Sequence, residues 1–312
     1  MISANTSSGI IVANAPISYG AFEVTVGIDP NVPSGVAILD EVSGAGYAGI
    51  DLGPVGYLGS GDELGKRLAD RGLGLAGAYL EFPFADAASL DRMMPELDAM
   101  LDTFDSVVPH VLGPQPRPTL ADNGSEARRA RPGSGARNPS SGHDAATWEQ
   151  FGVGLRRVVD HCRARGYEPT FHHETGTYVE APAEIEKVLS LSDVGLCLDT
   201  GHFMIGGGDP VRAVSEWASR INHVHIKDTS LAVFEQIVQE GEPTTAIWSR
   251  EAFPVLGKGD LDADGLIAAL AEIGYQGWLI VEQDILPQTS ERFEQAIQDQ
   301  RANRAFLAER GL

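Results

Sequence analysis

The chain has 312 residues and a formal net charge of -21 at pH 7, with 43% hydrophobic and 21% charged residues. This is the composition of an ordinary globular protein with enough apolar residues for a sizeable core, and no apolar run reaches the roughly 18 residues that a membrane span needs. Because so negative a chain repels phosphate backbones, we expect no nucleic-acid partner and no membrane partner.

The N-terminal sequence MISANTSSGI has neither a basic stretch nor a continuous apolar run. Nothing in it indicates export, so we expect a cytoplasmic protein. The two cysteines, Cys162 and Cys197, fall in a helical pattern and in an apolar strand. We therefore expect both to be reduced packing residues.

Eight short apolar runs along the chain have the character of strands, and helical patterns separate them. The strands are expected at 10–15, 48–53, 73–80, 106–113, 168–173, 194–199, 221–227 and 277–283. The helices are expected near 33–45, 61–72, 86–104, 145–166, 181–191, 209–220, 262–274 and 289–308. This alternation predicts an α/β fold with a parallel sheet, and eight units in one chain predict a single (β/α)8 TIM-barrel domain over 1–312. An open dinucleotide-binding sheet would need a glycine-rich loop after the first strand, and PISYGAFE is not one.

Two segments interrupt the regular alternation. Residues 113–144 are rich in Pro, Gly and Arg and are expected to form a long loop after the fourth strand, for which composition favours disorder over a mobile lid. Its arginines are expected either to meet an anionic substrate or to pair with acidic surface: Arg128, Arg129, Arg131 and Arg137. The second insertion, 231–260, is expected to form another wall of the site.

Four of the expected strands end in a residue that binds divalent metals: Glu174, Asp199, His225 and Glu282. Because the carboxyl ends of barrel strands meet at one face, these side chains are expected to converge. Carboxylate and imidazole ligands without a thiolate suit Mn²⁺ above all, with Co²⁺, Mg²⁺ or Zn²⁺ as alternatives. His223 lies on the same strand face as His225, and the position nearer the carboxyl end favours His225.

Seven motifs in this chain resemble those of the sugar phosphate isomerase/epimerase superfamily, whose members are xylose isomerase-like TIM barrels. They span nearly the whole chain in the expected order: PISYG, DLGPVGYL, HHETGTYVE, LCLDTGHFMIGGGDP, HVHIKD, LGKGDLD and GYQGWLIVEQD. Within the superfamily, DLGPVGYL together with WLIVEQD is most similar to the inosose dehydratase group. That group often has HPHxGT after the fifth strand, whereas Glu174 is the ligand type of the epimerases and isomerases.

The resemblance implies that the same four residues bind the metal and that Glu174 and Glu282 also transfer protons. It implies that His202, in DTGH, contacts the substrate or orients the site. Lys227 and His202 are candidates for the acid that protonates a departing hydroxide. The alternative for Lys227 is a surface salt bridge with Asp228. The remaining candidates are Tyr57, His172 and Lys258 for substrate contact, and Glu180 as an alternative to Glu174.

A metal held by such residues can polarise the ketone of a polyol, and loss of the neighbouring proton then gives an enediolate. We expect a metal-dependent hydro-lyase that dehydrates a keto-polyol such as 2-keto-myo-inositol, a step of inositol catabolism. The alternatives are a keto-sugar isomerase or epimerase, a 3-keto-glycoside lyase with the same metal site, and a sugar-binding barrel without catalysis. The resemblance also implies assembly as a homodimer or homotetramer.

Overall fold

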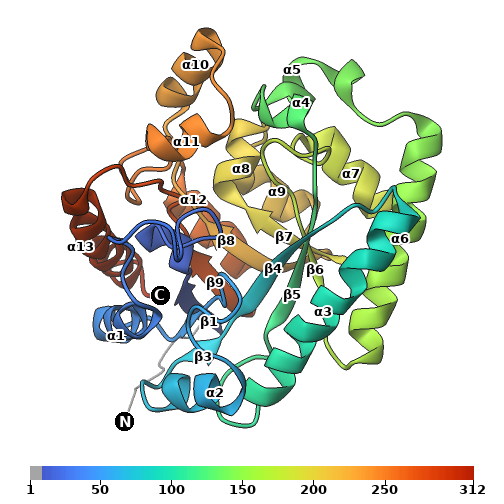
Figure 1. The fold of residues 1–312 in the computed structure, drawn as a ribbon. Coiled ribbons are helices and arrows are strands. Elements are labelled where there is room, and N and C mark those ends of the chain that lie inside the picture. The colour runs from blue at the N-terminus through green and yellow to red at the C-terminus, as the bar shows by residue number, and fades with distance from the viewer. Residues whose placement is uncertain (1–8) are drawn as a thin grey trace.

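Nine parallel strands form a nearly closed barrel in the computed structural model, which describes residues 9–312 (Figure 1). Their order in the sheet is β3-β2-β1-β9-β8-β7-β6-β5-β4. The strands are β1 (Ile10–Asn14), β2 (Gly49–Ile50), β3 (Gly74–Leu75), β4 (Gly77–Phe82), β5 (Arg117–Asp122), β6 (Thr170–His172), β7 (Gly195–Asp199), β8 (Ile221–Ile226) and β9 (Gly277–Val281).

The ends of the sheet meet at Ala76, which alone separates β3 from β4. The Ala76 amide donates to the Ile50 carbonyl at 2.9 Å, and the Arg117 amide donates to the Ala76 carbonyl at 3.0 Å. One continuous stretch of chain thus pairs with β2 on one side and β5 on the other. The predicted TIM barrel is confirmed, with the third predicted strand divided into β3 and β4.

Eight helices follow the strands and pack around the barrel. They are α1 (Gly35–Ala45), α2 (Gly61–Ala69), α3 (Ala87–Val107), α6 (Ala145–Ala164), α7 (Pro182–Leu191), α9 (Pro210–Glu216), α12 (Ala263–Glu272) and α13 (Ser290–Ala308). Several begin at a side chain that accepts a first-turn amide, among them Asp86, Asp144 and Asp262. The sequence predicted all eight helices.

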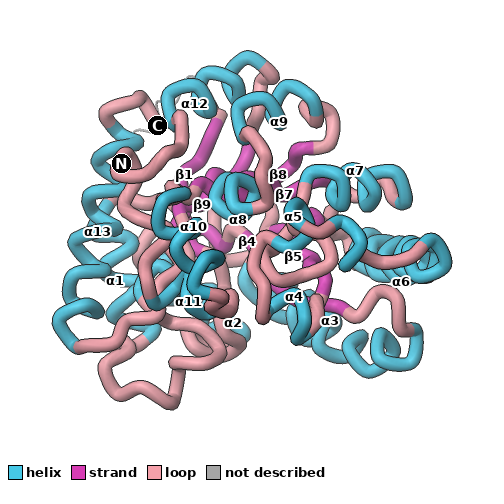
Figure 2. Tube along the Cα trace, turned by 90° about the horizontal axis from the view of Figure 1, so that it is seen from above, coloured by secondary structure: helices cyan, strands magenta, loops and turns pink. Residues whose placement is uncertain are grey.

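Seven further helices of the described chain lie over the carboxyl ends of the strands (Figure 2). They are the 3-10 helices η1 (Pro16–Tyr19) and η2 (Pro139–Ser141), and the α-helices α4 (Glu126–Arg129), α5 (Ser134–Arg137), α8 (Thr200–Ile205), α10 (Leu231–Glu240) and α11 (Thr245–Ser249). Five of the seven come from the two insertions. Their position makes these insertions walls around the mouth of the barrel.

Side-chain alternation along the strands separates the core from the barrel interior. Outward-facing residues such as Phe171, Leu198 and Val224 belong to the main apolar core with the surrounding helices. On β9 the alternate residues Trp278 and Ile280 form a smaller apolar cluster with alanines of β1 and its flank. The same inward parity continues past the strand ends into polar residues, and this places the functional groups at one face.

The fourth predicted strand, 106–113, was wrong. Helix α3 extends to Val107 because Leu97, Leu101, Phe104 and Val107 continue its buried face at helical spacing. The strand between β4 and β6 in the barrel is instead β5, which lies inside the segment 113–144 that was predicted to be a loop. Its flanking prolines gave the segment the composition of a loop.

The rest of the 113–144 segment is ordered, which corrects the expectation of disorder. Arg128 is buried and its guanidinium forms an ion pair with Glu180 at 2.9 Å and a second one with Glu184. Glu180 also accepts amide hydrogen bonds from Gly133 and Gly135. The segment is therefore anchored to the loop after β6 through charges that are excluded from water.

Among residues 9–312, no helix combines the length and apolarity needed to cross a bilayer. The predicted lack of an export signal concerns residues of which 1–8 lie outside the described part. Cys162 and Cys197 are both buried and unpaired, as expected.

Candidate metal and substrate site

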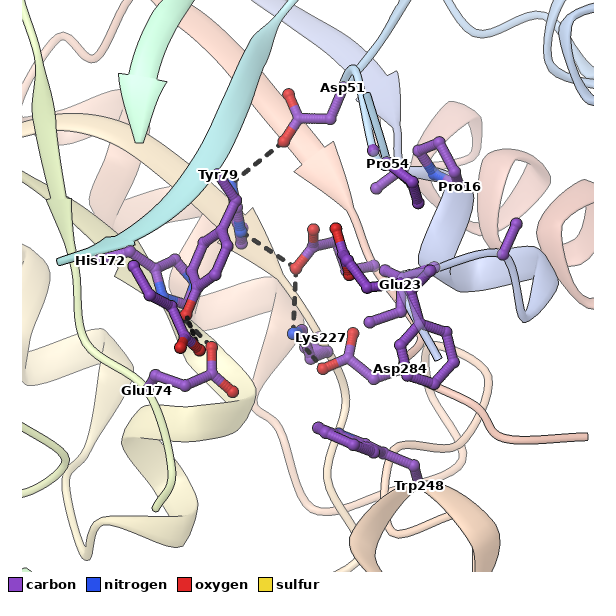
Figure 3. Close-up of a pocket in the computed structure, with 18 residues that line it drawn as sticks. Pro16, Glu23, Asp51, Pro54, Tyr79, His172, Glu174, Lys227, Trp248 and Asp284 are labelled. Atoms are coloured by element: carbon purple, nitrogen blue, oxygen red, sulfur yellow. Dashed lines mark hydrogen bonds and ion pairs between the residues drawn. The ribbon is translucent and has the colours of Figure 1, made fainter. Parts of the chain in front are cut away.

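A cavity of about 180 Å³ opens at the carboxyl ends of the strands (Figure 3). Side chains from the ends of β2, β4, β6, β8 and β9 line it, together with residues of the first loop and of α11. Six carboxylates and one lysine are among the described lining residues: Glu23, Asp51, Glu81, Glu174, Glu282, Asp284 and Lys227. The cavity is strongly acidic before any cation binds.

Four side chains at the base of this cavity form a group with the donor types of a divalent metal site. His172, Asp199, His225 and Glu282 each offer one ligand atom, and these atoms lie within 4.8 Å of one another. His225 Nδ1 is 3.0 Å from Glu282 Oε2, and His172 Nε2 is 3.4 Å from Asp199 Oδ2. Three of the four predicted ligands are thus brought together, and His172 joins them.

Glu174, the fourth predicted ligand, lies one step further out along the same inward face. Its carboxylate is 3.5 Å from His172 Nδ1 and 3.1 Å from His202 Nε2. Because side chains two residues apart share a strand face, His172 reaches the interior and Glu174 reaches the rim. The geometry therefore offers His172 as the fourth donor and leaves Glu174 beside the place where substrate would lie. Glu180, the predicted alternative to Glu174 as metal ligand, forms an ion pair with Arg128 instead.

The donor group fits a divalent cation by the test of hydrogen bonding. Buried polar atoms are nearly always hydrogen-bonded in folded proteins. Yet within the described residues four buried atoms of this group have no hydrogen-bond partner and make only ion-pair contacts with neighbouring charged groups: His172 Nδ1, Asp199 Oδ2 and both ring nitrogens of His225. Imidazole and carboxylate donors of this kind suit Mn²⁺, Zn²⁺ or Co²⁺.

Lys227 lies fully buried in the centre of the acidic groups. Its Nζ is 3.0 Å from Asp199 Oδ2, 3.0 Å from Glu282 Oε2 and 2.8 Å from Asp284 Oδ2. Burial alone would lower the pKa of Lys227, but Asp199 and Asp284 raise it well above its usual value. The expected salt bridge with Asp228 does not form, because Asp228 accepts backbone amides of the 257–261 loop instead.

His202 is held between the metal donors and the loop after β6. Thr175 Oγ1 lies 2.9 Å from His202 Nδ1, and the opposite nitrogen faces Glu174 and Asp284. Burial by itself would lower the pKa of His202, but the Glu174 carboxylate raises it. The imidazole is thus oriented toward the cavity by a fixed partner on each side.

Burial sets the protonation of three further groups. It raises the pKa of Glu174 to about 7 and that of Asp51 to about 7, and it lowers the pKa of His172 to about 4. Glu282 differs from Glu174: burial would raise its pKa, but His225 and Lys227 hold it well below the usual range. Neutral His172 and ionised Glu282 are the states that bind a metal.

Of the five predicted substrate contacts, the cavity's described lining includes His172 and Lys227 but not His202, Tyr57 or Lys258. The Tyr57 hydroxyl donates to the Pro33 carbonyl at 2.5 Å and so holds two loops together. Lys258 is exposed, and its backbone amide binds Asp228.

Several lining residues escaped the sequence reasoning. Asp284 lies two residues after Glu282, so strand periodicity could have placed it on the same face. Asp51 directly follows β2 and begins the motif DLGPVGYL, to which no role was assigned. Tyr79 and Glu81 lie two residues apart on β4, so strand periodicity could have placed them on one face. Trp248 had no such signal, because its position depends on how the 231–260 insertion packs.

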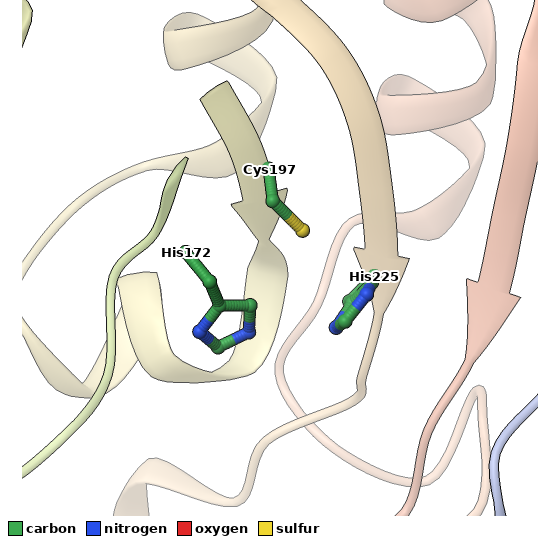
Figure 4. A group of neighbouring side chains, drawn as sticks. All are labelled: His172, Cys197 and His225. Atoms are coloured by element: carbon green, nitrogen blue, oxygen red, sulfur yellow. The ribbon is translucent and has the colours of Figure 1, made fainter. Parts of the chain in front are cut away.

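Cys197 precedes Asp199 by two residues on β7, so it lies on the same strand face, deeper in the barrel than the metal donors. Its thiol points toward His172 and His225, and the three side chains form a second compact donor group (Figure 4). Burial raises the pKa of Cys197 to about 11, so the free thiol is neutral. This agrees with a packing role beneath the site.

Comparison with known proteins places the chain in its family. Residues 39–307 match the family described as xylose isomerase-like TIM barrel. The chain is 33% identical over 153 residues to an inosose dehydratase of Lacticaseibacillus casei, a match that covers 48% of this chain and 51% of that protein. The chain thus spans about half the length of this relative.

Two further relatives extend over more of the chain. An inosose dehydratase of Geobacillus kaustophilus is 28% identical over 253 residues, or 79% of each chain. The crystal structure of the IOLI protein with a zinc atom superposes with a TM-score of 0.67 at 16% identity, over 97% of this chain and 99% of that one. That structure shares the fold. The matched family covers most of the chain, so the protein belongs to the xylose isomerase-like TIM barrel family.

Proposed function

We propose that this protein is a metal-dependent hydro-lyase that dehydrates a keto-polyol of the 2-keto-myo-inositol type. The observation that carries the proposal is the convergence of His172, Asp199, His225 and Glu282 at the base of one acidic cavity. Relatives that match this chain are inosose dehydratases, which supports the choice of reaction.

The four donors would hold a divalent cation at the base of the cavity, with Glu174 next to it. When bound, such an ion polarises a ketone and stabilises the negative charge that develops on its oxygen. Lys227 adds a buried positive charge 3.0 Å from both Asp199 and Glu282, so it offsets part of the charge of the carboxylates. The cavity can therefore hold an ionised substrate oxygen.

Proton transfer falls to the residues at the rim. Glu174 is placed to take the proton from the carbon beside the ketone, and a pKa near 7 suits a carboxylate that both accepts and returns a proton. The hydroxyl on the next carbon then leaves as water with a proton from Lys227 or His202, which lie 3.2 Å apart. The products are one water molecule and an enol that tautomerises to a diketone, without any change of redox state.

The charge of the cavity bears on the substrate. Six carboxylates face one lysine along its wall, so a phosphate group would meet repulsion rather than a binding site. Three of the four arginines considered as anion binders are already paired with a carboxylate: Arg128 with Glu180, Arg129 with Glu81 and Arg137 with Glu235. A neutral polyhydroxy ketone fits this environment.

A second candidate is a keto-sugar epimerase or isomerase, favoured by one observation. Glu174 and Glu282 both line the cavity, so one carboxylate can remove a proton and another can return it to a different face or carbon. A 3-keto-glycoside lyase would use the same first step. A barrel that only binds sugar is the remaining alternative, and absence of any bound or stabilising metal would favour it.

The test is incubation of the purified protein with Mn²⁺ and 2-keto-myo-inositol, followed by ultraviolet absorbance. We expect the absorbance of an enolised diketone to appear and to depend on the metal. A hexulose panel run in parallel checks for epimerised products. Epimerised ketose without diketone absorbance would overturn dehydration in favour of the second candidate.

A further inference from the structure

A second cavity, of about 330 Å³, adjoins the first at the mouth of the barrel. The two cavities share three lining residues, Glu81, Glu174 and Trp248. Figure 3 shows Glu174 and Trp248 on opposite sides of the lower end of the first cavity. A ligand seated at the metal donors would therefore have room to continue past these two side chains.

The wall of the second cavity is held in place by specific contacts. The Thr244 amide and hydroxyl both donate to the Arg129 carbonyl, at 2.7 Å and 2.9 Å. The Arg129 guanidinium donates to the Asn123 carbonyl and forms an ion pair with Glu81 at 3.4 Å. The two insertions are thus joined to one another and to β4, which makes this cavity a built feature rather than a gap between loops.

The groups around the second cavity suit a neutral, hydroxylated ring. Four threonines line it: the hydroxyls of Thr175, Thr177 and Thr244 already bond to His202, Glu174 and Arg129, whereas Thr245 lies at the exposed edge. Trp248 adds an aromatic surface, and its indole Nε1 is buried without a hydrogen-bond partner among the described residues. Its charged lining consists of Glu81, Glu126, Glu174 and Arg129, and Arg129 is already paired. An anionic group would be repelled there.

We propose that the second cavity binds a neutral glycosyl group attached to the reacting ring, so that a glycosylated keto-polyol binds more tightly than the free ring or a sugar phosphate. The identity of the reacting ring rests on the proposed function. The second group would lie between Trp248 and the Arg129–Thr244 wall, while the ketone lies at the metal donors.

Calorimetric titration of the Mn²⁺-loaded full chain tests this without any reaction. The three probes lack a ketone and cannot turn over: myo-inositol, galactinol, in which the same ring carries a galactosyl group, and myo-inositol 1-phosphate. We expect galactinol to bind at least tenfold more tightly than myo-inositol, and the phosphate to bind no more tightly than myo-inositol.

Substitution of Thr245 locates the effect. Thr245 is exposed at the edge of the second cavity, so Thr245→Trp fills that space without disturbing the core, and Thr245→Ser is the matched control. We expect Thr245→Trp to remove the advantage of galactinol and to leave myo-inositol affinity within twofold, and Thr245→Ser to retain both.

Four results would overturn the inference: equal affinity for galactinol and myo-inositol, tighter binding of the phosphate, an unchanged galactinol advantage in Thr245→Trp, or no binding of any probe. Failure of turnover on 2-keto-myo-inositol is a separate result, because it contradicts the proposed function without altering which analogue binds.

Discussion

Glu282 is largely buried, and neighbouring side chains stabilise its negative charge. It faces His225 at 3.0 Å and Lys227 at 3.0 Å, so a full negative charge is stabilised there in spite of burial. A neutral group of the same shape would leave the buried Lys227 ammonium with one counter-charge fewer and would remove one metal donor.

We expect Glu282→Gln to lower turnover by at least about 100-fold, since it removes both a ligand charge and a candidate proton acceptor. Steady-state kinetics with saturating Mn²⁺ measures this. Glu272→Gln, on the exposed face of α12, is the matched control and is expected to leave turnover unchanged. Near-normal turnover in Glu282→Gln would contradict the site assignment.

The pair His172 and Glu174 decides the fourth metal donor. His172 belongs to the compact donor group, whereas Glu174 contacts His202 at the rim. We therefore expect His172→Ala to weaken Mn²⁺ binding by at least about tenfold more than Glu174→Gln, while Glu174→Gln mainly lowers turnover. Calorimetric metal titration of the two variants measures it, and the reverse order of affinities would restore Glu174 as the ligand.

At the scale of elements, buried charge fixes how the insertion after β5 sits on the barrel. Arg128 and Glu180 are both almost fully excluded from solvent, and Glu180 receives amide hydrogen bonds from the loop before α5. Removing one partner of such a pair leaves the other charge buried and uncompensated.

We expect Arg128→Ala to lower the free energy of unfolding by about 3 kcal/mol. The neighbouring Arg131 is exposed, so Arg131→Ala is expected to change it by less than about 0.5 kcal/mol. Urea denaturation compares the two variants. Equal stability of Arg128→Ala and the wild type would show that the ion pair does not anchor the insertion.

Asp122, the last residue of β5, joins the same region to the loop after β6. Its Oδ2 accepts the amides of Gly124 and Tyr178, and burial raises its pKa to about 6. Because this folded-state pKa lies above the value of about 3.9 in an unfolded chain, the stability it contributes is present below pH 4 and is lost as the pH rises through 6.

Asp122→Asn keeps an oxygen acceptor but cannot ionise. Its free energy of unfolding relative to wild type is therefore expected to improve by roughly 1 kcal/mol between pH 5 and pH 7.5. Urea denaturation at both pH values gives this difference. A difference that is the same at both would mean that Asp122 does not titrate in this range.

For the molecule as a whole, strand and helix periodicity was enough to predict the barrel, because each βα unit carries its own pattern. Residues at strand ends, such as Asp199 and His225, could be predicted to meet because a parallel barrel brings all strand ends to one face. The strand β5 could not be predicted, because its Pro-rich sequence is typical of a loop and its extended conformation depends on pairing with β4 and β6. Trp248 could not be predicted either, because the packing of the 231–260 insertion places it.

The proposed function requires this barrel to use a bound divalent metal when the proton beside a ketone is removed. The measurement is deuterium uptake by 2-keto-myo-inositol in D2O. A chelator stops the reaction, and mass spectrometry then gives the deuterium content. We expect deuterium to be incorporated at the carbon beside the ketone, or in the diketone formed from it, only when the metal is present. We expect Glu282→Gln to lose this incorporation. Unlabelled and unconverted substrate in the presence of Mn²⁺, Co²⁺, Mg²⁺ and Zn²⁺ would contradict it.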